Sequence, residues 1–341
     1  MDSRHDIRPH VQFGRRGFLR GLSVAGAAGL LGASRRTAAE PPPETATLRI
    51  PNAAGVCVAP LHVAEELLPA EGFTDLRHVP PMGRVADALA SGSADIGIDF
   101  IGPLVIRLDA GAPLLLVAGA HTGCHEVFAR DSIRSLADLR GKNVAIPALG
   151  SGEHIFLSTM LAFAGIDPQR GVTWVARPVG EAMRLLAAGE IDAVPTGAPV
   201  AYEFRRRQVG RTLVNTATDP PWSRHFCCMI AASRDFVRRN PIAAKRALRA
   251  ILKGADLCAL DPERVAQRLF ERGITTTRDD AVQLFKENAY AKWREYDPEE
   301  TVRLHAQHLR AAGMITSSPE KVLAQGTDWR ILNELKKELK G

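Results

Sequence analysis

Several residues that bind or activate small molecules stand directly after short apolar runs of this chain. Cys57 follows the run 47–50, and Cys124 is followed by His125 and Glu126. A thiol, an imidazole and a carboxylate can hold a metal ion or form a nucleophile with its base. Adjacent residues of an extended chain point to opposite sides, so we expect Cys124 and His125 not to converge. We therefore predict no metal site here and assign no catalytic residue.

The segment Gly150-Ser151-Gly152-Glu153-His154 has the composition of an anion-binding turn. It lies between an expected strand and an expected helix at 152–164, whose first backbone N–H groups lack helical partners and suit an oxyanion. We predict that Ser151, Gly152 and His154 contact a ligand. Two alternatives stay open, because Ser151 could simply cap the helix and His154 could lie on its outer face.

Other candidate ligand-binding residues lie at expected strand ends and helix starts. Arg84 opens a helix and could pair with an anion, or it could be a solvated surface residue. Asp99 would suit an ammonium or hydroxyl group, or it could bond loop amides instead. Trp222 could form an aromatic wall or pack beside a hinge. The remaining candidates are Cys57, Phe100, Gly123, Cys124 and Thr196.

The cysteine content favours buried thiols over a metal centre. There are five, an odd number, so at least one thiol is unpaired: Cys57, Cys124, Cys227, Cys228 and Cys258. Cys227 and Cys228 are adjacent and would point in opposite directions on a strand, which is not the spacing of a zinc site. The sequence also lacks the Gly-x-Ser-x-Gly, phosphate-loop and His-Glu-x-x-His motifs, and we predict no cofactor.

The elements that position these residues alternate between strands and helices, which predicts an α/β protein with parallel-rich sheets flanked by helices. Strands are expected at 47–50, 76–79, 95–99, 114–120, 143–146, 172–175, 192–195 and 226–231. Helices are expected between them at 60–68, 84–90, 103–109, 152–164, 180–188 and 199–208. Long helical patterns at 241–258, 262–272, 278–287, 298–312 and 329–340 predict a helical C-terminal extension.

An internal repeat predicts two similar lobes. Leu89-Ala-Ser-Gly92-Ser-Ala-Asp95-Ile-Gly97 parallels Leu186-Ala-Ala-Gly189-Glu-Ile-Asp192-Ala-Val194. In both segments a helix is expected to end on a left-handed glycine, and an aspartate three residues later begins a strand. One α/β lobe built twice implies a cleft between the copies, beyond the carboxyl ends of the strands.

The first 39 residues read as an export signal. They hold seven Arg and no Lys against Asp2 and Asp6, which accounts for five of the six net positive charges of the chain. Arg15-Arg16 before a short apolar stretch is typical of a twin-arginine signal peptide, followed by a Pro-rich spacer at 40–45. No Cys follows the stretch, so we expect a periplasmic protein without a lipid anchor. The near-neutral remainder gives no support for nucleic-acid binding.

Four segments carry a family resemblance. They resemble the nitrate/sulfonate/taurine class of ABC-importer solute-binding proteins, to which the thiamine-pyrimidine synthases are related in fold. The segments are Asn52-Ala-Ala-Gly55-Val-Cys57-Val-Ala-Pro60-Leu-His-Val-Ala64, Ala137-Asp-Leu-Arg-Gly-Lys142-Asn-Val-Ala145, Gly150-Ser-Gly-Glu-His154 and Gly189-Glu-Ile-Asp192-Ala. The resemblance covers roughly residues 46–260. It implies the type II periplasmic-binding-protein fold, with lobe 1 at 46–130 plus about 222–341 and lobe 2 at about 131–221.

The resemblance also implies a function and partners. We expect a monomer that captures a small anionic or zwitterionic solute, such as a sulfonate, taurine, a carboxylate or nitrate, by hinge closure. Its partner would be an ABC permease of the inner membrane with a cytoplasmic ATPase. The alternative is a pyrimidine-synthase-like or other periplasmic enzyme that uses Cys124, His125 or the pair Cys227-Cys228.

Overall fold

A computed structural model describes residues 40–52, 55–80 and 84–340, and Pro42–Gly341 form one compact unit. The predicted signal peptide, residues 1–39, lies outside the described residues. Among the helices that the structure describes, none is long and apolar enough to span a bilayer.

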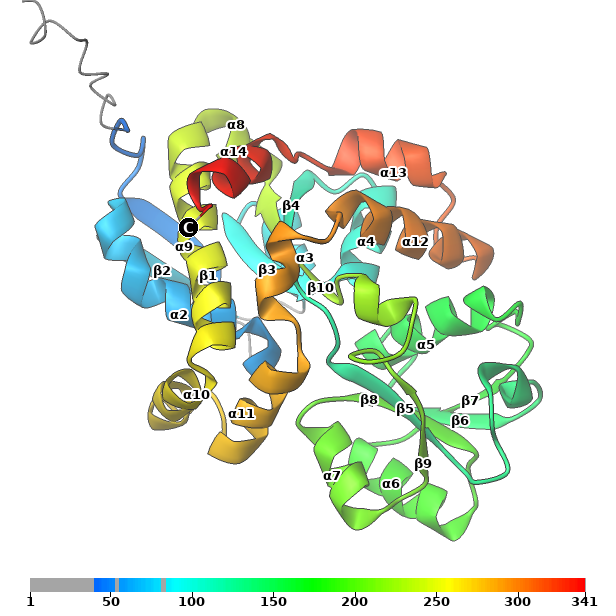
Figure 1. The fold of residues 1–341 in the computed structure, drawn as a ribbon. Coiled ribbons are helices and arrows are strands. Elements are labelled where there is room, and N and C mark those ends of the chain that lie inside the picture. The colour runs from blue at the N-terminus through cyan, green and yellow to red at the C-terminus, as the bar shows by residue number, and fades with distance from the viewer. Residues whose placement is uncertain (1–39, 53–54, 81–83, 341) are drawn as a thin grey trace, which may run out of the picture. The chain divides into compact units, whose positions relative to one another are not determined.

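The strands form three hydrogen-bonded groups (Figure 1). A parallel pair joins β1 (Thr47–Pro51) and β2 (Asp75–Val79). A three-stranded sheet has the order β3 (Ile96–Phe100), β10 (Cys228–Ser233) and β4 (Leu114–His121). A five-stranded sheet has the order β7 (Thr173–Ala176), β6 (Asn143–Ile146), β8 (Ala193–Gly197), β5 (His125–Ala129) and β9 (Arg211–Asn215).

The helices confirm the expected alternation and the helical C-terminus. Those between the strands are α2 (Ala59–Leu67), α3 (Val85–Ala90), α4 (Ile101–Asp109), α5 (Gly152–Phe163), α6 (Val179–Ala188) and α7 (Val200–Arg207). The C-terminal helices are α8 (Arg234–Arg239), α9 (Pro241–Leu260), α10 (Pro262–Glu271), α11 (Arg278–Glu287), α12 (Pro298–Ala311), α13 (Pro319–Gly326) and α14 (Arg330–Glu338). Short 3₁₀ turns are η1 (Val56–Val58), η2 (Leu68–Glu71), η3 (Leu136–Leu139), η4 (Trp222–Arg224) and η5 (Tyr290–Arg294).

The two halves repeat one strand order. The Asp95 amide donates to Arg49 O over 2.8 Å, which sets β1 beside β3 and gives the sequence β2-β1-β3-β10-β4. The five-stranded sheet has the matching order β7-β6-β8-β5-β9. In each, one strand runs antiparallel to both of its neighbours: β10 between β3 and β4, and β5 between β8 and β9.

The internal repeat of the sequence is confirmed in its hydrogen bonds. Gly92 and Gly189 both have positive φ, 70° and 73°, at the ends of α3 and α6. The Asp95 carboxylate accepts the backbone N–H of Arg49 at 2.7 Å, and the Asp192 carboxylate accepts that of Asn143 at 2.9 Å. Each aspartate thus holds the strand that begins after it against a neighbouring strand of its own sheet, β1 for Asp95 and β6 for Asp192.

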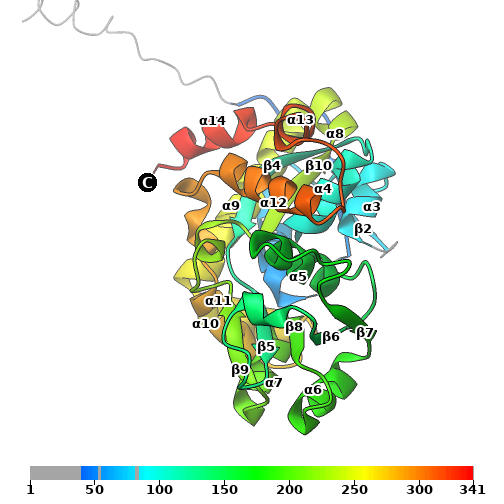
Figure 2. The ribbon, with the colours of Figure 1, turned by 90° about the vertical axis from the view of Figure 1, so that its right-hand side faces the viewer.

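Each antiparallel strand comes directly after the chain has crossed from one sheet to the other. The chain leaves β4 through residues 122–124 and enters β5 in the five-stranded sheet, and it returns from β9 through residues 216–227 to β10. The change of sheet therefore comes at residues 122–124, a little before the expected boundary at 130. The sequence pattern did not predict β5 and β9, because no helix separates β4 from β5 and only η4 separates β9 from β10. Figure 2 shows β5–β9 gathered with α6 and α7, away from β4 and β10.

The C-terminal helices begin and pack as the sequence predicts. Asp261 and Asp297 accept first-turn N–H groups of α10 and α12, from Arg264 and Glu299. Leu332 and Leu335 of α14 are buried against the core, and α14 contacts α9. The apolar stripe of the last helix therefore packs on the protein itself.

We expect Asp95→Ala to lower the free energy of unfolding by about 2–4 kcal/mol, because it removes the carboxylate that accepts from the Arg49 amide and guanidinium at a position only 4% exposed. Urea denaturation followed by circular dichroism measures the change. Asp235→Ala removes an exposed pair with Arg238 and should cost under about 1 kcal/mol. Equal effects of the two substitutions would contradict the role given to Asp95.

Candidate functional site

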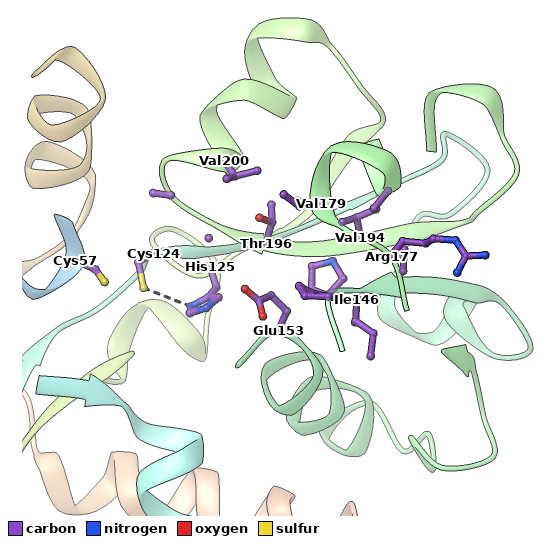
Figure 3. Close-up of a pocket in the computed structure, with 16 residues that line it drawn as sticks. Cys57, Cys124, His125, Ile146, Glu153, Arg177, Val179, Val194, Thr196 and Val200 are labelled. Atoms are coloured by element: carbon purple, nitrogen blue, oxygen red, sulfur yellow. Dashed lines mark hydrogen bonds between the residues drawn. The ribbon is translucent and has the colours of Figure 1, made fainter. Parts of the chain in front are cut away.

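A pocket of about 290 Å³ lies at the carboxyl ends of β6 and β8 (Figure 3). Most of its wall belongs to the five-stranded half, and Cys57 reaches it from the segment after β1. The lining residues are Cys57, Cys124, His125, Ala145, Ile146, Pro147, Glu153, Arg177, Val179, Ala182, Val194, Pro195, Thr196, Gly197, Ala198 and Val200. A pocket of this size suits a small organic molecule.

The turn that leads into β5 brings thiols and an imidazole together. Gly123 and Cys124 have φ of 81° and 80°, a left-handed conformation that is uncommon for cysteine. Cys124 Sγ consequently lies 3.4 Å from His125 Nδ1 and 3.0 Å from Cys227 Sγ. The expectation that Cys124 and His125 point apart is wrong here, because the alternation of side chains holds only for an extended backbone.

Cys228 and His121 lie on the inner side of the same cluster. The ligand atoms of His121, Cys124 and Cys228 lie within 4.8 Å of one another, as do those of Cys124, His125 and Cys227. Cys227 and Cys228 therefore both come near Cys124, against the expectation that they diverge. Cys227 precedes β10, whose first residue is Cys228, so the strand alternation does not yet apply.

Burial keeps this cluster neutral. It lowers the pKa of His125 to about 4, so the ring is uncharged at neutral pH. The hydrogen bond from Cys227 and the loss of solvent raise the pKa of the Cys124 thiol well above its ordinary value. Burial likewise raises the pKa of Cys227. The wall of the pocket thus offers protonated thiols and a neutral imidazole.

Residues 41–269 match the model of the NMT1-like family, which covers well over half of the chain. The chain belongs to the NMT1-like family. A protein of Brucella abortus (strain 2308) that is named as a binding protein is 28% identical over 178 residues, which are 52% of this chain and 54% of that protein. The chain spans about half the length of the curated relatives it matches.

Solved structures share the fold of this NMT1-like protein. The periplasmic nitrate-binding protein NrtA from Synechocystis PCC 6803 superposes with a TM-score of 0.69 at 17% identity, over 88% of this chain and 90% of that one. The alkanesulfonate-binding protein SsuA from Xanthomonas axonopodis pv. citri, solved with MOPS, gives 0.63 at 21% identity, over 80% and 96%. These likenesses confirm the periplasmic-binding-protein fold and the resemblance drawn from the sequence motifs.

Among the residues predicted to bind a ligand, Cys57, Cys124 and Thr196 line the pocket of the NMT1-like protein. Ser151 caps α5, and its hydroxyl accepts the His154 amide at 3.2 Å. His154 Nδ1 accepts the Gly150 amide, and its ring packs edge-on against Trp174. Gly152, Ser151 and His154 lie outside the pocket wall, so their contact with a ligand stays a prediction.

Arg84 and Asp99 both make contacts at the start of α3. Arg84 is the residue before α3, and its Nη2 donates to Gly150 O at 3.2 Å, which brings its guanidinium to the first turn of α5. The Asp99 carboxylate accepts the amides of Ala86 and Phe100 at 3.1 and 2.8 Å. Burial raises the pKa of Asp99. Asp99 therefore makes the contacts that the second interpretation expected, hydrogen bonds with nearby backbone amides.

Of the predicted aromatic residues, Phe100 packs on the pocket wall, and Gly123 directly precedes Cys124 of that wall. The Phe100 ring lies 5.1 Å from that of His125, and Phe156 stacks on the same imidazole at 4.7 Å. Trp222 is buried beside Phe163. A Cβ on Gly123 would lie 2.5 Å from a side-chain oxygen, so glycine is required there. None of Phe100, Gly123 and Trp222 lies in the pocket wall.

Two charged residues of the pocket were not predicted. Arg177 follows β7 directly, and Glu153 lies in the first turn of α5. The rule that ligands lie beyond the carboxyl ends of strands would have identified Arg177, whose strand was expected at 172–175. Figure 3 shows the Glu153 carboxylate beside the His125 ring, and Arg177 at the other end of the pocket.

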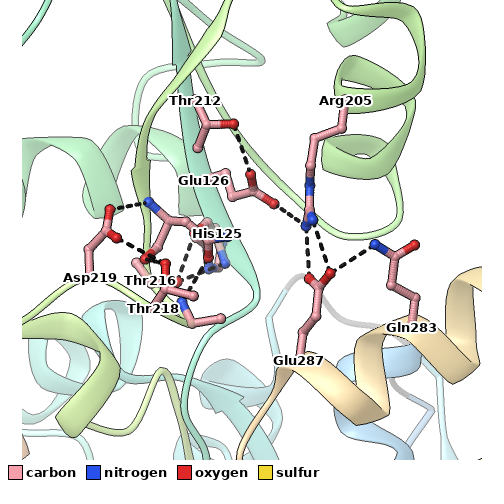
Figure 4. Close-up of polar contacts among 11 residues, drawn as sticks. His125, Glu126, Arg205, Thr212, Thr216, Thr218, Asp219, Gln283 and Glu287 are labelled. Carbon is pink, nitrogen blue, oxygen red and sulfur yellow. Dashed lines mark hydrogen bonds and ion pairs between the residues drawn. The ribbon is translucent and has the colours of Figure 1, made fainter.

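A charged network joins the five-stranded half to the C-terminal helices (Figure 4). Arg205 of α7 donates to Glu126 Oε1 at 2.6 Å and, through both Nη atoms, to the Glu287 carboxylate of α11 at 2.9 and 2.8 Å. Burial raises the pKa of Glu126. Burial would also raise that of Glu287, but the bonds from Arg205 and Gln283 lower it overall. Arg205 is thus the bridge between two carboxylates from different parts of the fold.

The burial of His305 makes the stability of the protein depend on pH. Burial, with the charges of His225 and His308, lowers its pKa to about 3, against about 6.5 in an unfolded chain. The unfolded state therefore binds the proton more readily, and stability falls as pH falls below about 6.5. When the pH is lowered from 7 to 5, the free energy of unfolding of the unsubstituted protein should fall. We expect it to fall by about 2 kcal/mol less in His305→Gln.

Urea denaturation at the two pH values measures this difference. His78→Gln alters an exposed side chain and should leave the pH dependence unchanged. An unaltered pH dependence in His305→Gln would contradict the buried, neutral state of His305.

Proposed function

We propose that this protein is the periplasmic solute-binding component of an ABC importer and captures a small zwitterionic or anionic organic solute. The observation that carries the proposal is the pocket, which places one cation and one anion at opposite ends of a mostly apolar wall. The relatives point the same way, since NrtA is named for nitrate and SsuA for alkanesulfonates.

The charges of the pocket favour a solute with both signs. The Arg177 guanidinium pairs with Glu181 at 3.2 Å, and we propose that a sulfonate or carboxylate displaces this partially exposed pair. Glu153 offers an acceptor to an ammonium group. The first amides of α5 add donors near Glu153. Thr196, between the two, supplies a hydroxyl. An aminosulfonate or a short amino acid of the taurine type fits these groups and a volume of about 290 Å³.

Capture by hinge closure is supported by the two crossovers. Two lobes, 46–124 with 228–340 and 125–215, would move about residues 122–124 and 216–227. Arg205–Glu287 and Arg84–Gly150 join these lobes, so both contacts would form on closing and break on opening. The ligand would then shift the balance toward the closed form by contacting both lobes.

Export and delivery complete the proposal. The twin-arginine pattern around Arg15-Arg16 supports export to the periplasm. There the closed, monomeric protein would dock on a membrane permease that is driven by a cytoplasmic ATPase. Anionic substrates would be handed over when the permease reopens the lobes.

The enzyme alternative draws on Cys124 and His125, which do meet in the pocket. A thiol nucleophile acts as the thiolate, and the raised pKa of Cys124 disfavours that form. His125 bonds two thiols but stays neutral. These properties favour binding over nucleophilic catalysis.

We expect Arg177→Ala to weaken the binding of the best probe about 10- to 100-fold, because it removes a charge-assisted hydrogen bond to the anionic group. The probes are taurine, ethanesulfonate, β-alanine, acetate and nitrate, ranked first by thermal shift and then by calorimetry. Arg184→Ala, which changes an exposed arginine of α6, is the matched control and should bind as before. Unchanged affinity in Arg177→Ala, or turnover of the probe, would contradict the proposal.

Glu287→Gln should weaken the same probe about 3- to 10-fold, because it removes the charge that holds α11 to Arg205 in the closed form. Calorimetry gives the affinity, and small-angle scattering gives the radius of gyration without the probe, which should rise. Glu263→Gln breaks an exposed pair with Lys286 and serves as the control. A hinge without this contact would leave both readouts unaltered.

A further inference from the structure

The convergence of thiols and imidazole at the pocket wall is not needed for capturing an organic solute. Cys124 Sγ and Cys227 Sγ lie 3.0 Å apart, and His125 Nδ1 lies 3.4 and 3.2 Å from them. We propose that Cys124, His125 and Cys227 bind one thiophilic divalent cation of the zinc class. This goes beyond the proposed function, since the ion could bind whether or not the pocket takes an organic solute.

The ligand atoms suit such an ion in their chemical elements and in the distances between them. Zinc takes thiolate sulfur at about 2.3 Å and imidazole nitrogen at about 2.0 Å. A tetrahedral ion would hold two sulfurs roughly 3.7 Å apart at that bond length. Cys124 and Cys227 therefore need to separate by less than about 1 Å from their 3.0 Å spacing. Because Cys124 and His125 both line the pocket, the fourth position of the ion would face it.

The charges favour a divalent ion. Two thiolates and a neutral imidazole carry two negative charges, which a divalent cation cancels in a buried site. A monovalent ion would leave one negative charge without a counter-charge, at a large desolvation cost. The Glu153 carboxylate beside His125 adds further attraction for a cation.

The backbone already holds the ligands in place. The left-handed conformation of Gly123 and Cys124 turns the thiol toward Cys227, and a non-glycine residue adopts it only where the surroundings enforce it. Thr216 bonds the His125 amide and carbonyl at 3.1 and 2.7 Å. Phe156 stacks on the His125 ring. The site is therefore ordered before an ion arrives.

A second set, His121, Cys124 and Cys228, shares Cys124 with the first, so the two sets cannot each hold an ion. His121 is fully buried, whereas Cys124 and His125 are partly exposed. An ion can reach the first set from the pocket, which is why we assign it there. Bound in that position, the ion would tie residue 124 of one crossover to residue 227 of the other.

The experiment uses the full chain, reduced and freed of metal, and adds Co²⁺ and then Zn²⁺. We expect one Co²⁺ per chain, with the near-ultraviolet thiolate charge-transfer band and strong visible bands of a tetrahedral site, and displacement by Zn²⁺. Cys227→Ser and Cys124→Ser should weaken binding by more than about 100-fold, since even an outer-shell partner is worth about 10- to 100-fold. Cys258→Ala, a buried cysteine outside the cluster, should bind as before.

Two further measurements decide the assignment. Cys228→Ser should keep the Co²⁺ spectrum, and loss of the spectrum there with retention in Cys227→Ser would overturn the proposed ligand set. In the unsubstituted protein, Zn²⁺ should slow alkylation of Cys124 and Cys227, mapped by mass spectrometry, but not that of Cys57. A Cys124–Cys227 disulfide that persists under mild reductant, or no protection by Zn²⁺, would overturn the metal site.

Discussion

The double crossing of the chain between the two sheets is the constraint on which the rest of the structure depends. β5 and β10 each follow a crossing directly and run antiparallel to both of their neighbours. The whole five-stranded sheet separates β10 from β3 and β4 along the chain, so the first sheet is completed only after the second crossing. The two crossings also meet in space, where the amide of Cys227 donates to His121 O. Residues 103 positions apart in the chain thus meet at the pocket wall.

Much of this architecture could be predicted because it is written locally. The glycine that ends a helix and the aspartate three residues later recur in both halves, and the structure gives Asp95 and Asp192 the same backbone partner relation to Arg49 and Asn143. The parallel strands are short apolar runs between helices and were found. β5 and β9 were not, because their pairing is long-range: β5 follows β4 after three residues without a helix between them, and no α-helix separates β9 from β10. Local pattern cannot show which sheet such a strand joins.

The residues of the candidate site also differ in whether local sequence could identify them. Cys124 and Thr196 were selected by the rule for carboxyl ends, Cys57 was selected because it follows the first strand, and all three line the pocket. Ser151, His154 and Asp99 have the right chemistry, but their polar atoms bond nearby amides that need partners. Sequence position alone cannot tell a ligand-binding group from a capping group, because both use the same atoms. The meeting of Cys124 with Cys227 depends on a left-handed residue and a crossover, and neither has a local signature outside glycine.

Burial separates the chemistry of the pocket into two parts. At the crossover wall it keeps His125 neutral and the thiols protonated, so this wall carries no net charge until a cation displaces the thiol protons. Glu153 lies beside His125 of this wall, and Arg177 lies at the other end of the pocket. The crossover wall and Arg177 of the five-stranded half therefore border one and the same pocket.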